Sequence, residues 1–212
     1  MRYSYVLWDF NGTIVDDVDT CIEIINILLQ QQGKEIVSKE QYRNVFMFPV
    51  IEYYKRVGVI KRDEEFVEMA HRWMDLYYER EATLTTFHDI HSTLEKIKKL
   101  GIKQGVLSAS RIDQLQRMVD QFGVGMYMDD ILGISDIYAT SKVHIGLEFI
   151  EKSGYDKASI VMIGDTIHDF EVAKQMGIAC ILVSRGHQSI EVLASCGVSI
   201  VSSAEDVVSL LV

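Results

Sequence analysis

A repeated unit of amphipathic helix, glycine and short apolar strand is the feature that most constrains the fold of this chain. Four segments have helical spacing of apolar residues, and a glycine follows each one directly. They are 90–100, 113–122, 143–153 and 169–176, followed by Gly101, Gly123, Gly154 and Gly177. Glycine after a helix supplies the left-handed backbone that ends it. Alternating helices and strands are typical of a doubly wound α/β sheet, so we predict that fold class.

The predicted strands are short, aliphatic and bounded by glycine or polar turns. The first precedes Asp9, and the later ones cover 104–108, 159–164 and 179–183. Runs that are apolar throughout are typical of parallel strands covered on both faces. We therefore expect these strands to be parallel and buried.

Residues 16–84 break this rhythm, because they contain no convincing strand and repeat apolar side chains at helical spacing instead. The repeats are clearest in 21–28 and 66–77. We predict an inserted α-helical cap at 16–84 and a core made of 1–15 plus 85–212. Hinges are expected near 15–17 and 83–87, where the chain leaves and rejoins the core.

Aromatic residues gather in the predicted cap around Pro49, the single proline of the chain. A proline is well tolerated at the first turn of a helix, so we expect a helix to open there. The aromatic cluster is either the small core of the cap or a surface that faces a substrate.

The charge and cysteine content exclude several functional classes. The 31 acidic and 21 basic residues among 212 give a net charge of -10, which argues against nucleic acid or an anionic membrane as a partner. Three widely spaced cysteines predict neither a disulfide scaffold nor a zinc site. No signal-like or membrane-spanning apolar run is present, so we expect a cytoplasmic protein. We expect it to be a monomer or a homodimer.

Asp9 stands at the carboxyl end of the first predicted strand, and Phe10-Asn11-Gly12-Thr13 follows it. Open α/β sheets bind ligands at the carboxyl ends of their strands. An aspartate carboxylate can also form a covalent phosphoryl intermediate. We therefore predict that Asp9 is a nucleophile.

Ser108 ends the second predicted strand, and Ser110 with Asp113 has the pattern of a helix N-terminal cap. One interpretation is that the segment only begins a helix. The other is that Ser108 and the helix N-terminus hold phosphate oxygens.

Lys142 and a pair of acids complete the set of candidate residues. Lys142 lies at the start of a predicted helix, where a cation opposes the helix dipole, so a functional role is plausible. Its ammonium could neutralise Asp9 and a phosphoryl group. Asp165 and Asp169 are four residues apart across a strand end and the first helical turn, where they could bind Mg²⁺. Asp169 could instead simply complement the helix dipole.

Taken together, these segments resemble the haloacid dehalogenase superfamily, and more closely its phosphoglycolate-phosphatase-like branch with a helical cap. The resemblance covers nearly the whole chain and implies a Rossmann-like core, an aspartyl-phosphate intermediate, a small phosphorylated substrate and Mg²⁺ as cofactor. The matching segments are Asp9-Phe10-Asn11-Gly12-Thr13, Ser108, Lys142, and Gly164-Asp165-Thr166 with Asp169.

The resemblance also implies roles for the acids. Asp9 would be the nucleophile and a metal ligand, and Asn11 would offer its backbone carbonyl to the metal. Asp165 would complete the protein ligands, and Asp169 would bind the metal directly or through water. The resemblance also implies that the phosphate is bound by Gly12, Thr13, Ser108, Ala109 and Lys142.

Asn11 departs from the family pattern, which has at this position an acid that protonates the leaving group. An amide cannot transfer that proton, and such catalysis contributes roughly 10²–10⁴-fold. We expect weak turnover of alkyl phosphates, better turnover of aryl or acyl phosphates, and a gain on alkyl phosphates in Asn11→Asp. Alternatively His71, His88 or His168 supplies the proton.

Other functions remain open at this stage. Cleavage of carbon–phosphorus bonds would need a Schiff-base lysine in the cap, for which Lys55 and Lys61 are the candidates. Carbon–halogen cleavage would not need a metal, so Asp165 and Asp169 speak against it. A slow or non-catalytic sensor of phosphorylated metabolites is the alternative from another class.

Overall fold

A six-stranded parallel sheet forms the centre of the protein in the computed structural model, which describes residues 2–134 and 142–212. The strand order is β5-β4-β1-β6-β7-β8. The strands are β1 (Tyr5–Trp8), β4 (Lys103–Arg111), β5 (Asp130–Ile134), β6 (Ile160–Gly164), β7 (Ala179–Val183) and β8 (Ser199–Val201). This arrangement confirms the doubly wound α/β class, because strands far apart in sequence are neighbours through crossover connections.

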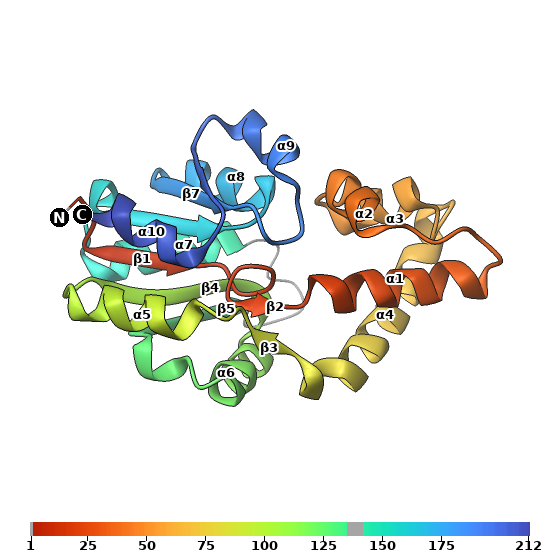
Figure 1. Ribbon diagram of the computed structural model, residues 1–212, viewed down its shortest axis with the longest axis horizontal. Helices are drawn as coiled ribbons and strands as arrows, with labels where there is room; N and C mark the ends of the chain where they lie inside the picture. Colours follow the sequence, from red (N-terminus) through yellow and green to blue (C-terminus); the bar gives the residue numbers. More distant parts are fainter. Residues whose placement is uncertain (1, 135–141) are drawn as a thin grey trace.

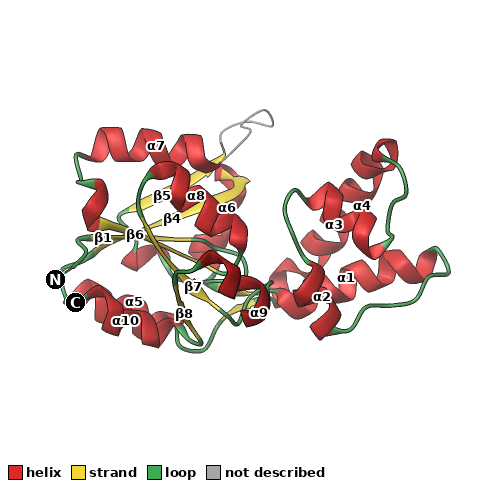
Figure 2. Ribbon diagram, turned by 90° about the horizontal axis from the view of Figure 1, so that it is seen from above, coloured by secondary structure: helices red, strands yellow, loops and turns green. Residues whose placement is uncertain are grey.

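Helices cover both faces of this sheet (Figure 2). The first core cluster joins one face to α5 (Ile90–Lys99), α6 (Ile112–Gln121) and α10 (Ala204–Leu211). The second joins the other face to α7 (Lys142–Ser153) and α8 (Ile167–Met176). Successive residues of β1 alternate between the two clusters, as the two-residue period of a strand requires. This explains why the strand is apolar along its whole length.

Four further helices lie apart from the sheet, beyond the end of β1 (Figures 1 and 2). They are α1 (Val18–Gln31), α2 (Lys39–Val45), α3 (Val50–Val57) and α4 (Phe66–Arg80). The chain passes between this helical group and the sheet through β2 (Val15–Asp16) and β3 (Thr85–Thr86), which pair antiparallel. These features support the proposed division into a core of 1–15 plus 85–212 and a cap of 16–84, and we use those names below.

Short helical segments complete the described chain. They are α9 (Ile190–Leu193) and the 3₁₀ turns η1 (Asp63–Glu65), η2 (Glu81–Thr83), η3 (Gly125–Tyr127), η4 (Lys157–Ser159) and η5 (Ala194–Cys196). Within the two described ranges, no helix has both the length and the apolar character needed to cross a bilayer.

The predicted helix cap at Ser110 is wrong. β4 continues through Ser110 to Arg111, and α6 begins at Ile112 with no side-chain hydrogen bond at its N-cap. The continuation is possible because β5 pairs with β4 as far as Arg111, across an irregularity in register. The pairing of β4 with a neighbouring strand therefore overrides the local capping pattern.

Asp89 joins three elements of the core. Its buried carboxylate pairs with Arg185 at 2.5 Å and accepts hydrogen bonds from the backbone amides of Ala204 and Glu205 at 2.9 and 3.3 Å. It therefore links the start of α5, the loop after β7 and the N-terminus of α10, where a negative charge is also favoured by the helix dipole.

We expect Asp89→Ala to destabilise the protein by about 3 kcal/mol, because it leaves Arg185 without its buried partner and removes the acceptor of two N–H groups at the start of α10. Thermal unfolding should then occur about 6–12 °C lower. Glu95→Ala is the matched control, since it removes an exposed i,i+4 pair with Lys99 from the same helix. A Tm loss as small as that of the control would contradict this role of Asp89.

Candidate active site

The loop that follows β1 is a tight turn built around Gly12. Gly12 has a φ of +71°, and a Cβ at this position would lie 2.4 Å from Oδ2 of Asp165. Its N–H donates to the carbonyl of Val15 and to Oδ1 of Asp17, both at 2.9 Å. The hydroxyl of Thr13 donates to Oδ1 of Asp165 at 3.1 Å. Only glycine fits this turn, which brings the loop against the end of β6.

Lys142 lies between two carboxylates. Its Nζ is 2.6 Å from Oδ1 of Asp9 and 2.5 Å from Oδ1 of Asp169, and all three residues are buried. Burial alone would lower the pKa of Lys142, but Asp169 and Asp9 raise it. The first residue of α7 is therefore a fixed positive charge beside Asp9.

Asp165 and Asp169 are held mainly by donors from the backbone and from threonines. Asp165 accepts from the backbone N–H of His187 at 2.6 Å through Oδ2. Oδ2 of Asp169 accepts from the N–H groups of Asp165 and Thr166, at 3.2 and 3.0 Å, and from the Thr166 hydroxyl at 2.7 Å. Asp169 thus caps α8, as the dipole interpretation predicts, and also pairs with Lys142.

The carboxylates of Asp9, Asp165 and Asp169 form a buried cluster whose closest oxygens all lie within 4.8 Å of one another. Burial raises the pKa of Asp9 and of Asp165, and the nearby acids raise both further. For Asp169, burial would also raise the pKa, but the Lys142 ammonium holds it below its usual value. A cluster of hard oxygen donors with more negative than positive charge fits a divalent cation such as Mg²⁺.

Ser108 and Ala109 lie on the strand next to β1. Since Trp8 pairs with Val106, Ser108 reaches the same edge of the sheet as Asp9. Ser108 is buried, and its Oγ is 3.2 Å from the Ser110 hydroxyl and accepts from the Ser110 N–H at 3.1 Å. Ala109 is exposed. The irregular part of β4 at Ser108 is thus held locally, and the Ser108 hydroxyl is oriented by Ser110.

Asn11 belongs to a hydrogen-bond network that sequence reasoning missed. The network includes Asp17 before α1, Tyr77 of α4 and His187 of the loop after β7. His187 follows the end of a parallel strand, the same placement that identified Asp9, so that rule could have found it. Asp17 and Tyr77 carry no such signal, because their contact depends on how the cap helices pack.

His187 is a charged side chain in this network. Its Nε2 is 3.3 Å from Oδ1 of Asp17, and its Nδ1 is 2.9 Å from the Tyr42 hydroxyl of α2. Burial alone would lower the pKa of His187, but the Asp17 carboxylate raises it to about 9. The ring is therefore protonated at neutral pH and balances a buried carboxylate.

The histidines named from the sequence have different surroundings. His71 and His88 are exposed, whereas His168 is half-buried and stacks on Phe48 of the cap with ring centroids 4.6 Å apart. Burial lowers the pKa of His168. The aromatic residues around Pro49 serve both the cap and its contact with the core, since Phe46 stacks on Tyr42 and also lies 5.0 Å from the His187 ring, while Phe48 contacts His168.

The cap lysines do not have the surroundings of a Schiff-base lysine. Lys55 forms ion pairs with Asp63 at 2.6 Å and Glu52 at 2.9 Å, and the hydrogen bonds to both raise its pKa. Lys61 is exposed. A Schiff base requires a neutral amine, which these surroundings disfavour.

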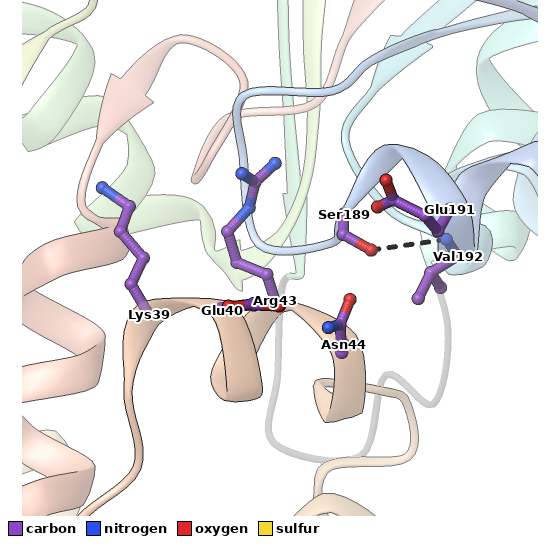
Figure 3. Close-up of a pocket in the computed structure, with 7 residues that line it drawn as sticks. All are labelled: Lys39, Glu40, Arg43, Asn44, Ser189, Glu191 and Val192. Atoms are coloured by element: carbon purple, nitrogen blue, oxygen red, sulfur yellow. Dashed lines mark hydrogen bonds between the residues drawn. The ribbon is translucent and has the colours of Figure 1, made fainter.

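A groove of about 790 Å³ lies between α2 of the cap and α9 of the core (Figure 3). Its lining contains none of the predicted site residues; it consists of Lys39, Glu40, Arg43, Asn44, Ser189, Glu191 and Val192. Arg43 reaches from this groove to the loop after β7, where it donates to the carbonyls of Gly186 at 2.9 Å and Gln188 at 3.0 Å. The groove marks one edge of the contact between cap and core.

Known proteins share this sequence pattern and this fold. The chain is 26% identical over 188 residues to the probable phosphatase IndB of Dickeya dadantii, covering 85% of this chain and 81% of that protein. It is 21% identical to the phosphoglycolate phosphatase of Pseudomonas savastanoi pv. phaseolicola, covering 86% and 70%. A haloacid dehalogenase-like hydrolase from Streptococcus pneumoniae has the same fold, with a TM-score of 0.84, 16% identity and coverage of 100% and 99%.

The family model for haloacid dehalogenase-like hydrolases matches residues 6–183, which include Asp9, Ser108, Lys142, Asp165 and Asp169. The match spans most of the chain and includes the strand ends that carry the buried charges. The chain therefore belongs to the haloacid dehalogenase-like hydrolase family.

Proposed function

We propose that this protein is a Mg²⁺-dependent phosphomonoester hydrolase that acts through an aspartyl-phosphate on a small phosphorylated metabolite. The observation that carries the proposal is the Lys142 ammonium held between Asp9 and Asp169, with Asp165 beside them. The family membership and the relatives named as phosphatases support it. The named activity of those relatives makes a phosphoglycolate-like compound one candidate substrate.

Asp9 is the proposed nucleophile. An oxygen of its carboxylate attacks phosphorus in line, the bond from phosphorus to the ester oxygen breaks, and the leaving group departs with that electron pair. Water then cleaves the acyl phosphate, which releases inorganic phosphate and regenerates the carboxylate. Lys142 offsets the negative charge that accumulates beside Asp9 in both steps.

In the proposed site, Asp9, Asp165 and the backbone carbonyl of Asn11 hold the cation. Bound Mg²⁺ would neutralise phosphoryl oxygens and bring the substrate's phosphate against the carboxylate of Asp9. Oδ1 of Asp169 already faces the Lys142 ammonium, whose positive charge excludes a second cation there, and Oδ2 accepts three hydrogen bonds around Thr166. We therefore propose that Asp169 acts on the cation through water. Its direct contribution is to orient Lys142.

The remaining predicted residues receive roles that match their contacts. Ser108 and the adjoining backbone at Ala109 in β4 are proposed to receive phosphate oxygens together with Lys142. Gly12 makes room for Asp165, and the Thr13 hydroxyl donates a hydrogen bond that fixes Asp165. The N–H of Gly12 is already donated to Asp17. We propose the cytoplasm as the location, because Cys21, Cys180 and Cys196 are free thiols, as a reducing compartment requires.

Asn11 sets the proposed substrate preference. An amide cannot protonate a departing alkoxide, so esters of poor leaving groups react slowly. Aryl and acyl phosphates release stable anions and need little protonation. The sensor alternative differs in one respect, since it requires ligand binding without phosphate release.

A phosphate-release screen with Mg²⁺ tests the proposed function. We expect aryl and acyl phosphates to turn over about 10–100-fold faster than alkyl phosphates, because the acid step is missing. Asp9→Asn should lose at least about 1,000-fold in turnover on every substrate, because it removes the nucleophile. Circular dichroism and Tm serve as the control for folding. Phosphate release that survives in Asp9→Asn would contradict the mechanism. Ligand binding without phosphate release, in both wild type and Asp9→Asn, would favour the sensor alternative.

Magnesium binding should also change stability. Protons compete with the cation for Asp9 and Asp165, whose pKa values lie above their usual range, so binding strengthens as pH rises. We expect excess Mg²⁺ to raise Tm by about 5–10 °C at pH 8 and by less at pH 6. Asp165→Asn should lose this gain, while Asp19→Asn on exposed α1 surface should keep it. Equal gains at the two pH values would contradict the proposed ligands.

A further inference from the structure

Asn11, Asp17 and Tyr77 form a closed ring of hydrogen bonds beside the carboxylate cluster. Asn11 Nδ2 donates to Oδ2 of Asp17 and to the Tyr77 hydroxyl, both at 2.8 Å, and that hydroxyl donates to Oδ2 of Asp17 at 3.0 Å. The carboxylate can only accept, so the nitrogen of the amide must face it. Both hydrogens of the Asn11 amide are therefore in use.

Asp17 holds the negative charge of this ring. It is 1% exposed and also accepts from the Gly12 N–H at 2.9 Å. The Cys21 thiol lies 3.7 Å from its Oδ2, and the His187 ring lies 3.3 Å from its Oδ1. Burial alone would raise the pKa of Asp17, but His187 and the hydrogen bonds from Asn11 and Tyr77 lower it. The buried negative charge of this network therefore belongs to position 17.

A carboxylate at position 11 would not fit the same surroundings. Its oxygen would stand about where Nδ2 now lies, 2.8 Å from the Asp17 carboxylate, and would replace the hydrogen bond to Asp17 with repulsion. The neutral amide and the neighbouring carboxylate are complementary in charge and in hydrogen bonding. An aspartate at position 11 therefore fits only if position 17 becomes an amide as well.

We propose that Asn11 and Asp17 are a matched amide–carboxylate pair, and that Asp17 and Tyr77 are positioning residues that withhold the Asn11 amide hydrogens from the leaving group. Tyr77 comes from cap helix α4, so the ring closes only where the cap lies over the loop after β1. The catalytic part of this inference rests on the proposed phosphatase function and deepens its substrate preference. The simple expectation that Asn11→Asp restores acid catalysis is replaced by a requirement for two changes.

The pairing is tested by the Tm values of ligand-free wild type, Asn11→Asp, Asp17→Asn and the double variant. We expect Asn11→Asp to lower Tm by about 5 °C and the double variant to regain at least half of that loss. Asn11→Asp with Asp19→Asn is the matched control, because Asp19 is an exposed acid of α1 paired with Lys39. No recovery is expected there. If Asp17→Asn does not fold, Asp17→Ser removes the same charge.

Turnover supplies a second readout. Asn11→Asp alone should not raise the rate on an alkyl phosphate such as glycerol phosphate, whereas the double variant should raise it at least about 10-fold above wild type. Additive Tm losses, or a gain on glycerol phosphate in Asn11→Asp alone, would overturn the pairing. A wild type without any phosphate release would defeat the proposed function, and the Tm comparison would still decide the pairing.

Tyr77→Phe separates positioning from general support of the fold. Removing the hydroxyl frees one Asn11 hydrogen to stabilise a departing oxygen. The ratio of the rates on glycerol phosphate and p-nitrophenyl phosphate should therefore rise at least about 3-fold, even if both rates fall. Tyr78→Phe, on the same helix with an exposed side chain, is the control. A purely structural Tyr77 would lower both rates equally, and an unchanged ratio would overturn its positioning role.

Discussion

The ion pair of Lys142 with Asp9 and Asp169 is the interaction on which the rest of the site depends. Three carboxylates are buried close together, and a buried charge without a partner costs several kcal/mol. One ammonium placed between two of them makes the cluster compatible with a folded core. It also leaves an excess of negative charge. The charge balance therefore stabilises the fold and leaves the net negative charge on which the proposed cation site rests.

The parallel sheet explains how these charges meet. β1 lies between β4 and β6, so the loops that follow three neighbouring strands open at one edge. Lys142 reaches that edge from the first turn of α7, and Asp169 reaches it while capping α8. Backbone N–H groups hold Asp165 and Asp169, so their positions follow from the fold rather than from flexible side chains. Such fixed dipoles need no reorganisation during a reaction.

Much of the core could be predicted from the sequence because it depends on local periodicity. The strands around β1, β6 and β7 are uniformly apolar, and the helices that cover them end at glycines. β5 and β8 were missed because both lie at sheet edges, where the side chains are not fully buried and the apolar signal is weak. α10 was missed as well. The cap at Ser110 was predicted wrongly, because a local pattern carries no information about strand pairing.

The candidate site also contains residues that the sequence predicts and residues that it does not. Asp9 and Asp165 follow from the rule about strand ends, and Lys142 and Asp169 follow from their places at the starts of helices. The structure brings all four together. Their catalytic and metal-binding roles remain proposals. Asp17 and Tyr77 could not be found this way, because the contact between them crosses 60 residues of cap. It depends on tertiary packing of helices whose faces are similar in sequence.

The loop after β7 contacts both the candidate site and the cap. Its His187 N–H holds Asp165, and its Gly186 and Gln188 carbonyls accept hydrogen bonds from Arg43 of the cap. Any movement of α2 away from the sheet must break the hydrogen bonds from Arg43. It thereby loosens the loop whose His187 N–H holds Asp165. The position of the cap and the alignment of Asp165 are mechanically linked through this loop. Selection on cap movement would therefore act on the precision of the candidate site as well.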